Sequence, residues 1–183
     1  AIMWLKITNN YSPNFSLPKR SKKKIKFLII HYTGMKSESL AIKRLCDPRA
    51  KVSSHYFIKK NGNILQLVPD LYEAWHAGKS SWKKYNSLNK TSIGIEIQNS
   101  GHDYFYENFS SKQINYKILN SKFSFLVKDF KSIEKILFCS VVPKSFNLIK
   151  RFLQKKTKQK CYEIKDLNLK SLININVNYK QVG

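Results

Sequence analysis

Histidines and one carboxylate are the residues of this chain whose types and positions suggest chemistry. His31 ends a short apolar run, Phe27-Leu28-Ile29-Ile30, and directly precedes Tyr32-Thr33-Gly34. A histidine at a strand end beside a loop can reach a shared metal ion, whereas a mid-strand histidine would be buried in the sheet. A catalytic zinc site needs three protein ligands and an open position for water, with a base nearby. On its position alone, His31 is either a structural histidine or a metal ligand.

Glu96 is the most informative carboxylate. From Thr91 to Gln98 the residues alternate, with Ile93, Ile95 and Ile97 on one face and Glu96 on the other. An acidic side chain in the middle of a strand is costly unless it faces a site or solvent. The alternation therefore predicts a strand that presents Glu96 to a functional site.

Secondary-structure signals along the chain indicate which elements position these residues. Ser37 can cap a helix that runs to about Leu45, and the segment Lys60-Asn61-Gly62-Asn63 is a strong hairpin signal. A polar, aromatic loop is expected from Pro69 to Lys90. The remaining expected elements are a strand over 25–31, hairpin strands over 54–58 and 64–68, a helix over 111–131, a strand over 135–142, a helix over 145–156 and a strand over 161–164. The last three form a strand–helix–strand unit, which favours parallel pairing.

Four motifs follow one another over roughly 70 residues. They are Ile29-Ile30-His31-Tyr32-Thr33, Val52-Ser53-Ser54-His55-Tyr56, Ala74-Trp75-His76-Ala77-Gly78 and Ser92-Ile93-Gly94-Ile95-Glu96. The series closely resembles the zinc-dependent N-acetylmuramoyl-L-alanine amidases of the AmpD and AmiD type. The resemblance covers residues 25–116, after an N-terminal arm of residues 1–24. It implies an α/β fold, with a mixed central sheet and flanking helices.

The resemblance also implies roles for individual residues. His31 matches the first zinc ligand, and Glu96 matches the carboxylate that activates the zinc-bound water as general base and then acid. His76 matches a loop that lines the substrate groove. Trp75 and Trp82 either stack on sugar rings or are buried in the core. His55 is interpreted as a hydrogen-bonded support for the site, and His102 receives no role. The implied substrate is the amide between N-acetylmuramic acid and L-alanine, in murein or in anhydro-muropeptides.

The chain departs from this family after the Glu96 strand. The family places its second zinc ligand in a later Gly-His segment, but no histidine follows His102. Cys139, Cys161 and Asp166 are the late candidates for replacement ligands, and the apolar surroundings of Cys139 favour a core cysteine. An incomplete Zn²⁺ ligand set predicts weak or absent activity. The alternative function is a non-catalytic module that binds peptidoglycan or muropeptides.

The C-terminal part resembles a different family. Residues 136–143 and 173–183 are similar to an internal piece of type III pantothenate kinase, although that family's phosphate-binding Asp-Gly segment is absent. No kinase activity is expected. Two partial families, joined near residues 116–121, suggest a gene fusion, a deletion between loci or a chimeric assembly of sequence reads. Residues 117–183 are accordingly predicted to be a separate kinase-like fragment.

Composition narrows the remaining classes. The net charge of +23 invites a nucleic-acid hypothesis, but the lysines are spread along the chain, as AT-rich coding bias would produce. The one dense cluster, Lys19-Arg20 with Lys22-Lys23-Lys24, is expected to be a solvated loop. No apolar run is long enough to cross a membrane. Without a signal-peptide pattern, and with three cysteines, the expected location is cytoplasmic; a lost upstream segment would permit a periplasmic one.

Overall fold

The computed structural model describes residues 7–101, 131–139, 143–157 and 159–163. Two α-helices are present among them, α1 (Glu38–Cys46) and α3 (Pro143–Thr157). Three short 3-10 helices are η1 (Lys22–Lys24), η2 (Pro48–Ala50) and η3 (Leu88–Thr91). The strands are β1 (Ile7–Asn9), β2 (Phe15–Ser16), β3 (Phe27–Tyr32), β4 (Tyr56–Ile58), β5 (Ile64–Gln66), β6 (Glu73–Ala74), β7 (Ser81–Trp82), β8 (Tyr85–Asn86), β9 (Ser92–Ile97), β10 (Lys135–Phe138) and β11 (Lys160–Glu163).

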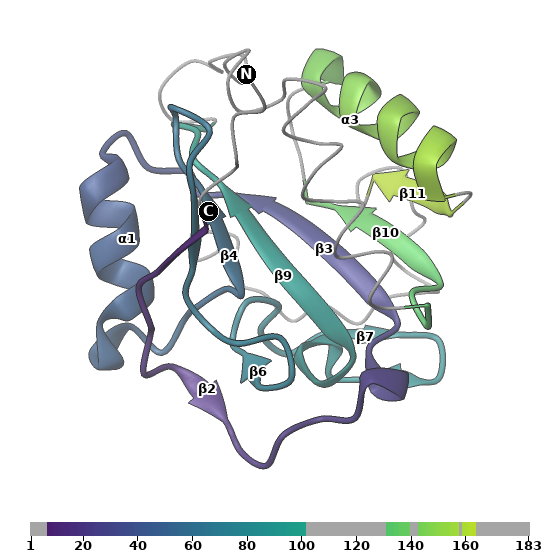
Figure 1. Cartoon of the computed structure of the whole chain (residues 1–183), viewed down its shortest axis with the longest axis horizontal. Coiled ribbons are helices and arrows are strands. Elements are labelled where there is room, and N and C mark those ends of the chain that lie inside the picture. Colours follow the sequence, from purple (N-terminus) through teal and green to yellow (C-terminus); the bar gives the residue numbers. More distant parts are fainter. Residues whose placement is uncertain (1–6, 102–130, 140–142, 158, 164–183) are drawn as a thin grey trace.

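A seven-stranded sheet, in the order β1-β5-β4-β9-β3-β10-β11, organises these elements. Only the β4–β5 pair within it is antiparallel, and all the other pairs are parallel. Figure 1 shows β4, β9, β3 and β10 side by side across the molecule, with α1 beside β4 and α3 near β11. The mixed sheet with flanking helices that was expected from the sequence is confirmed.

Local chemistry explains the elements between β3 and β5. Ser37 caps α1 by accepting a hydrogen bond from the Leu40 backbone N–H at 3.2 Å. In the hairpin that joins β4 to β5, Gly62 has a φ of 82°, and Asn61 accepts a hydrogen bond from the Asn63 backbone N–H. The helix and the hairpin both lie where the sequence predicted them.

The two faces of the central strands differ in chemistry. One face is entirely apolar, and Ile149, Phe152 and Leu153 of α3 pack against it. Its strand residues are Leu28, Ile30, Ile93, Ile95, Ile97, Ile136 and Phe138. The opposite face carries Phe27, Ile29 and Leu137, but it also carries His31 and Glu96 at its carboxyl-terminal end. His31 and Glu96 therefore lie on the same face of these central strands.

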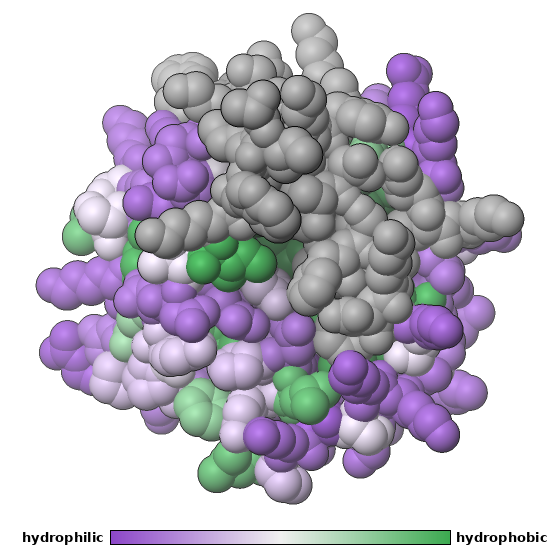
Figure 2. Space-filling view, in the orientation of Figure 1, coloured by the Kyte–Doolittle hydropathy of each residue, from purple (hydrophilic) through white to green (hydrophobic). Residues whose placement is uncertain are grey.

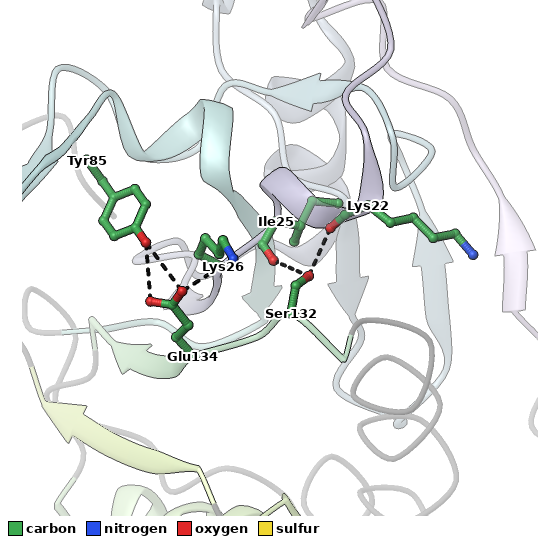
Figure 3. Close-up of polar contacts among 6 residues, drawn as sticks. All are labelled: Lys22, Ile25, Lys26, Tyr85, Ser132 and Glu134. Carbon is green, nitrogen blue, oxygen red and sulfur yellow. Dashed lines mark hydrogen bonds and ion pairs between the residues drawn. The ribbon is translucent and has the colours of Figure 1, made fainter.

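The strand–helix–strand unit formed by β10, α3 and β11 joins this same sheet. β10 pairs in parallel with β3, which precedes it by more than one hundred residues, and also with β11. The segment that leads into β10 is anchored as well, since Ser132 Oγ donates to the carbonyls of Lys22 and Ile25, at 2.9 and 2.7 Å (Figure 3). Glu134 forms an ion pair with Lys26 at 3.3 Å and accepts a hydrogen bond from Tyr85. The sheet is thus continuous between residues before and after position 117.

The basic cluster before β3 corrects one sequence expectation. Lys19 and Lys22–Lys24 are exposed, as a solvated loop requires, but Arg20 is only 7% exposed and does not lie in solvent. The expectation was wrong for this one residue because its hydrogen-bond partners come from distant segments. The helix expected over 111–131 lies almost entirely outside the described residues.

Among the coloured residues in the view of Figure 2, hydrophilic side chains predominate, with scattered apolar patches between them. Neither α-helix of the described residues has the length and apolar character needed to span a bilayer.

Candidate active site

Parallel pairing of β3 with β9 places His31 and Glu96 opposite each other in the register. Neighbouring strands lie about 4.8 Å apart, so the two side chains emerge next to each other on one face. Both are buried, with 5% and 6% of their surfaces exposed. The sheet therefore brings together the two residues that the sequence singled out, an imidazole and a carboxylate.

Glu96 has an unpaired oxygen. Its Oε2 atom is buried and has no hydrogen-bond partner among the described residues. Burial raises the pKa of this carboxyl group well above its usual value. A carboxyl group in this state holds a proton at a higher pH than an exposed glutamate, which is a property of general acids and bases.

The His31 ring contacts the ring of a second histidine, His76, in the loop after β6. His31 Nε2 lies 3.0 Å from His76 Nδ1, and His76 Nε2 lies 3.0 Å from Ser92 Oγ at the start of β9. The two rings cross at 72°, with their centroids 5.2 Å apart. His76 is partly buried, and both of its ring nitrogens make these contacts, which point toward the interior of the site.

His55 lies under the site, directly before β4. Its Nδ1 accepts a hydrogen bond from the Gly94 backbone N–H at 2.9 Å, and its Nε2 lies 3.0 Å from the Tyr72 carbonyl oxygen. Since a carbonyl only accepts, Nε2 carries the proton and Nδ1 is the acceptor. Both ring nitrogens of His55 therefore form hydrogen bonds with backbone atoms, which is consistent with a supporting role.

Arg20 holds the same region from the N-terminal arm. Its guanidinium donates to the backbone carbonyls of Asn89, Ser92 and Asp70, at 2.6 to 2.8 Å. One of its nitrogens also lies 3.0 Å from His55 Nε2. Burial lowers the pKa of Arg20 to about 10, against the opposing effects of Glu73 and Asp70, and the side chain stays charged at neutral pH.

The three histidines share an environment that favours the neutral ring. Burial lowers the pKa of His31 to about 4. Burial, followed by the charge of Arg20, lowers the pKa of His55 to about 3. The pKa of His76 is also held well below its usual value, first by burial and then by His31, His55 and Arg20. Neutral rings can each offer one nitrogen lone pair, as metal binding requires.

The two tryptophans lie in different surroundings. Trp75 is partly buried and donates from Nε1 to Ser16 Oγ of β2 at 2.7 Å. Trp82 is only 3% exposed and packs against Tyr162, and the ammonium of Lys135 lies 5.4 Å from its ring centre. Of the two alternatives left open by the sequence, core burial therefore describes Trp82.

Cys139 and Cys161, two of the candidate metal ligands from the C-terminal part, lie on opposite faces of the sheet. Cys139 follows β10, donates its backbone N–H to Ile30 and lies on the His31 side, where burial and Glu96 raise its pKa to about 12. Cys161 packs in the apolar cluster on the opposite face. Asp166 and His102 lie outside the described residues.

The described residues do not supply a complete set of ligands for a zinc ion. Across residues 7–101, 131–139, 143–157 and 159–163, no three His, Cys, Asp or Glu side chains are grouped so that they could hold a metal ion. His31 offers one suitable nitrogen, and the nearby Cys139 offers a protonated thiol. The described residues alone therefore do not fit a zinc centre with three protein ligands.

Sequence reasoning gave no role to Ser92, Gly94 or Arg20. Ser92 and Gly94 belong to a quoted motif, and their position on the Glu96 face of the strand was the available signal. Arg20 gave no signal, because it stands among exposed lysines.

A profile for N-acetylmuramoyl-L-alanine amidase matches residues 21–117, which is more than half of the chain. The chain belongs to this amidase family. Family members are hydrolases, and they are generally zinc-dependent.

Individual relatives agree with this assignment. The chain is 46% identical over 85 residues to the amidase AmiD of Escherichia coli, covering 43% of this chain and 30% of that protein. It is 27% identical over 153 residues to the 1,6-anhydro-N-acetylmuramyl-L-alanine amidase AmpD of Haemophilus influenzae, covering 73% and 79%.

A second similarity confirms the resemblance to pantothenate kinase. The type III pantothenate kinase of Pelagibacter ubique is 55% identical over 73 residues, covering 40% of this chain and 29% of that protein. The chain thus spans about 30% of the length of that kinase and of AmiD.

Solved structures show the same fold. A structure of AmpD aligns with a TM-score of 0.62 at 23% identity, covering 80% of this chain and 93% of that chain. The Escherichia coli amidase AmiD, in complex with the substrate anhydro-N-acetylmuramic acid-L-Ala-D-γ-Glu-L-Lys, aligns with a TM-score of 0.59 at 26% identity, covering 75% and 60%.

Proposed function

We propose that the chain is an amidase for the bond between N-acetylmuramic acid and L-alanine in peptidoglycan or its fragments, with a rate reduced by the incomplete zinc ligand set of the described residues. The observation that carries this proposal is the pairing of His31 with Glu96 on one face of the sheet, where Glu96 keeps a buried, unpaired oxygen. Membership of the amidase family supports the reaction class. The substrate class follows from the relatives, one of which was solved with an anhydro-muropeptide.

Glu96 is the proposed proton carrier. As a carboxylate, Glu96 would accept a proton from the attacking water. Because burial raises the pKa of this carboxyl group, it would then hold that proton and donate it to the leaving amine. His31 is the proposed metal ligand within the described residues, through the nitrogen that does not contact His76. When bound, zinc would supply Lewis-acid polarisation and an activated water. Trp75 and His76 remain proposed contacts for the substrate, whereas Trp82 is buried in the core.

A muropeptide-binding module without catalysis is the second candidate. The observation in its favour is the absence of a three-ligand metal group from the described residues. Such a module would retain the fold and bind muropeptides but would release no product. Retention on insoluble murein, without liberation of peptide, distinguishes it from an amidase.

The direct test is cleavage of a purified anhydro-muropeptide by the full chain with added zinc. Mass spectrometry would follow release of the free peptide. Glu96→Gln should lower the rate about 10²- to 10⁴-fold, the usual contribution of a general acid or base. Glu134→Gln is the matched control, since it makes the same change at an exposed glutamate that pairs with Lys26. Equal rates for the Glu96→Gln variant and the wild-type chain would disprove the assigned role.

We further propose that the chain joins an amidase-like part, over 25–116, to a kinase-like part, over 117–183. The similarity to a pantothenate kinase supports the second part. Long-read sequencing across codons 110–125 tests the junction, because a real protein requires one contiguous reading frame. Two separate genes at that place would disprove it.

A further inference from the structure

The contacts around His76 determine which atoms carry protons. Ser92 Oγ lies 2.6 Å from the Leu88 carbonyl oxygen, and because a carbonyl only accepts, the hydroxyl proton points there. The same oxygen lies 3.0 Å from His76 Nε2. With its proton already used, Ser92 Oγ accepts from His76, so His76 Nε2 carries a proton.

This assignment extends to His31. A neutral imidazole with its proton on Nε2 offers a lone pair on Nδ1. His76 Nδ1 therefore accepts the contact of 3.0 Å, and His31 Nε2 donates it. His31 Nδ1 is then left as a lone pair on the Glu96 face of the sheet.

We infer that His76 is a positioning residue, which fixes the tautomer of His31 so that Nδ1 is the nitrogen free to bind a ligand. Metal-binding histidines commonly donate their other ring N–H to a fixed acceptor, which sets both orientation and tautomer. Here the acceptor is another histidine, which is oriented in turn by Ser92 and, through it, by the backbone of Leu88. The inference rests on the proposed function only for the identity of the ligand that Nδ1 would bind.

Gly94 provides the space that this arrangement needs. A Cβ atom at Gly94 would lie 2.3 to 2.6 Å from three atoms of the His76 ring, which is far inside van der Waals contact. The backbone cannot easily withdraw, because the Gly94 N–H is held by His55 Nδ1. His76 is also fixed from its own backbone, where Asn89 Oδ1 accepts from the N–H groups of His76 and Ala77, at 3.1 and 2.8 Å.

Nitrogen NMR of the histidine rings tests the inference without any need for activity or metal. In the full chain at neutral pH, His31 should show a protonated, pyrrole-type Nε2 and an unprotonated, pyridine-type Nδ1. His76→Asn should keep this pattern, because the amide Oδ1 can replace Nδ1 as acceptor. His76→Leu should lose it, and the two ring resonances should shift toward averaged values. Assignments come from the wild-type spectrum and from His31→Gln.

Gly94→Ala provides a second route to the same result, since it displaces His76 without changing any polar group. It should shift the His31 resonances as His76→Leu does. Ile93→Val, a change of similar size on the apolar face of β9, should leave them in place. A proton on Nδ1 in the wild type, or an unchanged pattern in both His76→Leu and Gly94→Ala, would overturn the inference. Absence of amide cleavage, with the expected tautomer, would instead count against the proposed function alone.

Discussion

The two faces of strands β3, β9 and β10 are built by alternate residues of the same segments, yet their energetics differ. The apolar face consists of aliphatic and aromatic side chains under α3, and its members are almost fully buried. On the other face, burial extends to His31, Glu96 and Ser92. Apolar burial stabilises the fold, whereas burial of titratable groups costs free energy unless they are hydrogen-bonded.

The buried polar groups on this second face differ in whether their atoms are hydrogen-bonded. His76 and His55 use both of their ring nitrogens, so their burial is largely compensated. Glu96 leaves Oε2 without a partner among the described residues. A buried polar atom without a partner in a native fold calls for an explanation, such as a catalytic role or a bound water or ion. The contrast is consistent with the proposed roles, in which His76 and His55 orient the site and Glu96 carries the proton.

Acid should destabilise the polar face most. The pKa values of His31 and His55 are lowered to about 4 and about 3, so the unfolded chain binds more protons than the folded one below pH 6.5. Stability is therefore fully present above pH 6.5 and is lost as pH falls toward these values. The two residues together should cost several kcal/mol between pH 6.5 and 4, at about 1.4 kcal/mol per pH unit for each.

Urea unfolding at a series of pH values measures this loss. The Glu96→Gln background is best, because the raised pKa of Glu96 gives a pH dependence of opposite sign. Ile95→Ala should leave the slope unchanged, since it acts on the apolar face. Stability independent of pH between 6.5 and 4.5 would contradict buried, neutral histidines.

A truncation on the apolar face should have a comparable but pH-independent effect. Ile95 is 1% exposed and lies within the cluster that α3 covers. Ile95→Ala should lower the free energy of unfolding by about 2–5 kcal/mol, through lost burial and a residual cavity. The rate of amide cleavage per folded molecule should stay near that of the wild type. A loss of rate beyond the unfolded fraction would show that the two faces are not separable.

Glu96→Gln should act in the opposite direction on stability. Because the folded-state pKa of Glu96 is raised, wild-type stability falls as pH rises above the unfolded value of about 4.5. The neutral amide does not titrate, so the stability of the variant relative to the wild type should rise between pH 4 and pH 8. Thermal melts at both pH values measure the difference. A relative stability that does not rise between the two pH values would contradict a raised folded-state pKa for Glu96.

Features of the fold that depend on residues close in the sequence could be predicted, whereas features that depend on residues far apart in the sequence could not. The α1 cap at Ser37 and the Asn61-Gly62 turn were predicted correctly, because each is decided by residues within three positions. The alternation in β9 likewise predicted which face Glu96 occupies. The burial of Arg20 was missed, since its acceptors lie 50 to 72 residues away.

The site shows the same limit. The sequence identified His31 and Glu96, but their adjacency comes from pairing between strands 65 residues apart. The contact between His31 and His76 bridges 45 residues, and no local pattern announces it. The pairing of β10 with β3 was equally hidden, because the strand–helix–strand pattern predicts parallel pairing without naming the neighbour.

The smallest expected effect concerns Trp75, at the margin of the polar face. Its Nε1–H donates to Ser16 Oγ at 2.7 Å and so ties β2 of the N-terminal arm to the end of β6. Trp75→Phe should cost about 0.5–1.5 kcal/mol, the usual net value of one hydrogen bond, together with some lost packing. A double-mutant cycle with Ser16→Ala isolates the contribution of this hydrogen bond. A coupling energy near zero would show that the bond does not contribute to stability. If Trp75 also stacks on a sugar ring, Trp75→Phe should keep muropeptide binding while Trp75→Ala weakens it, because only the phenylalanine retains an aromatic face.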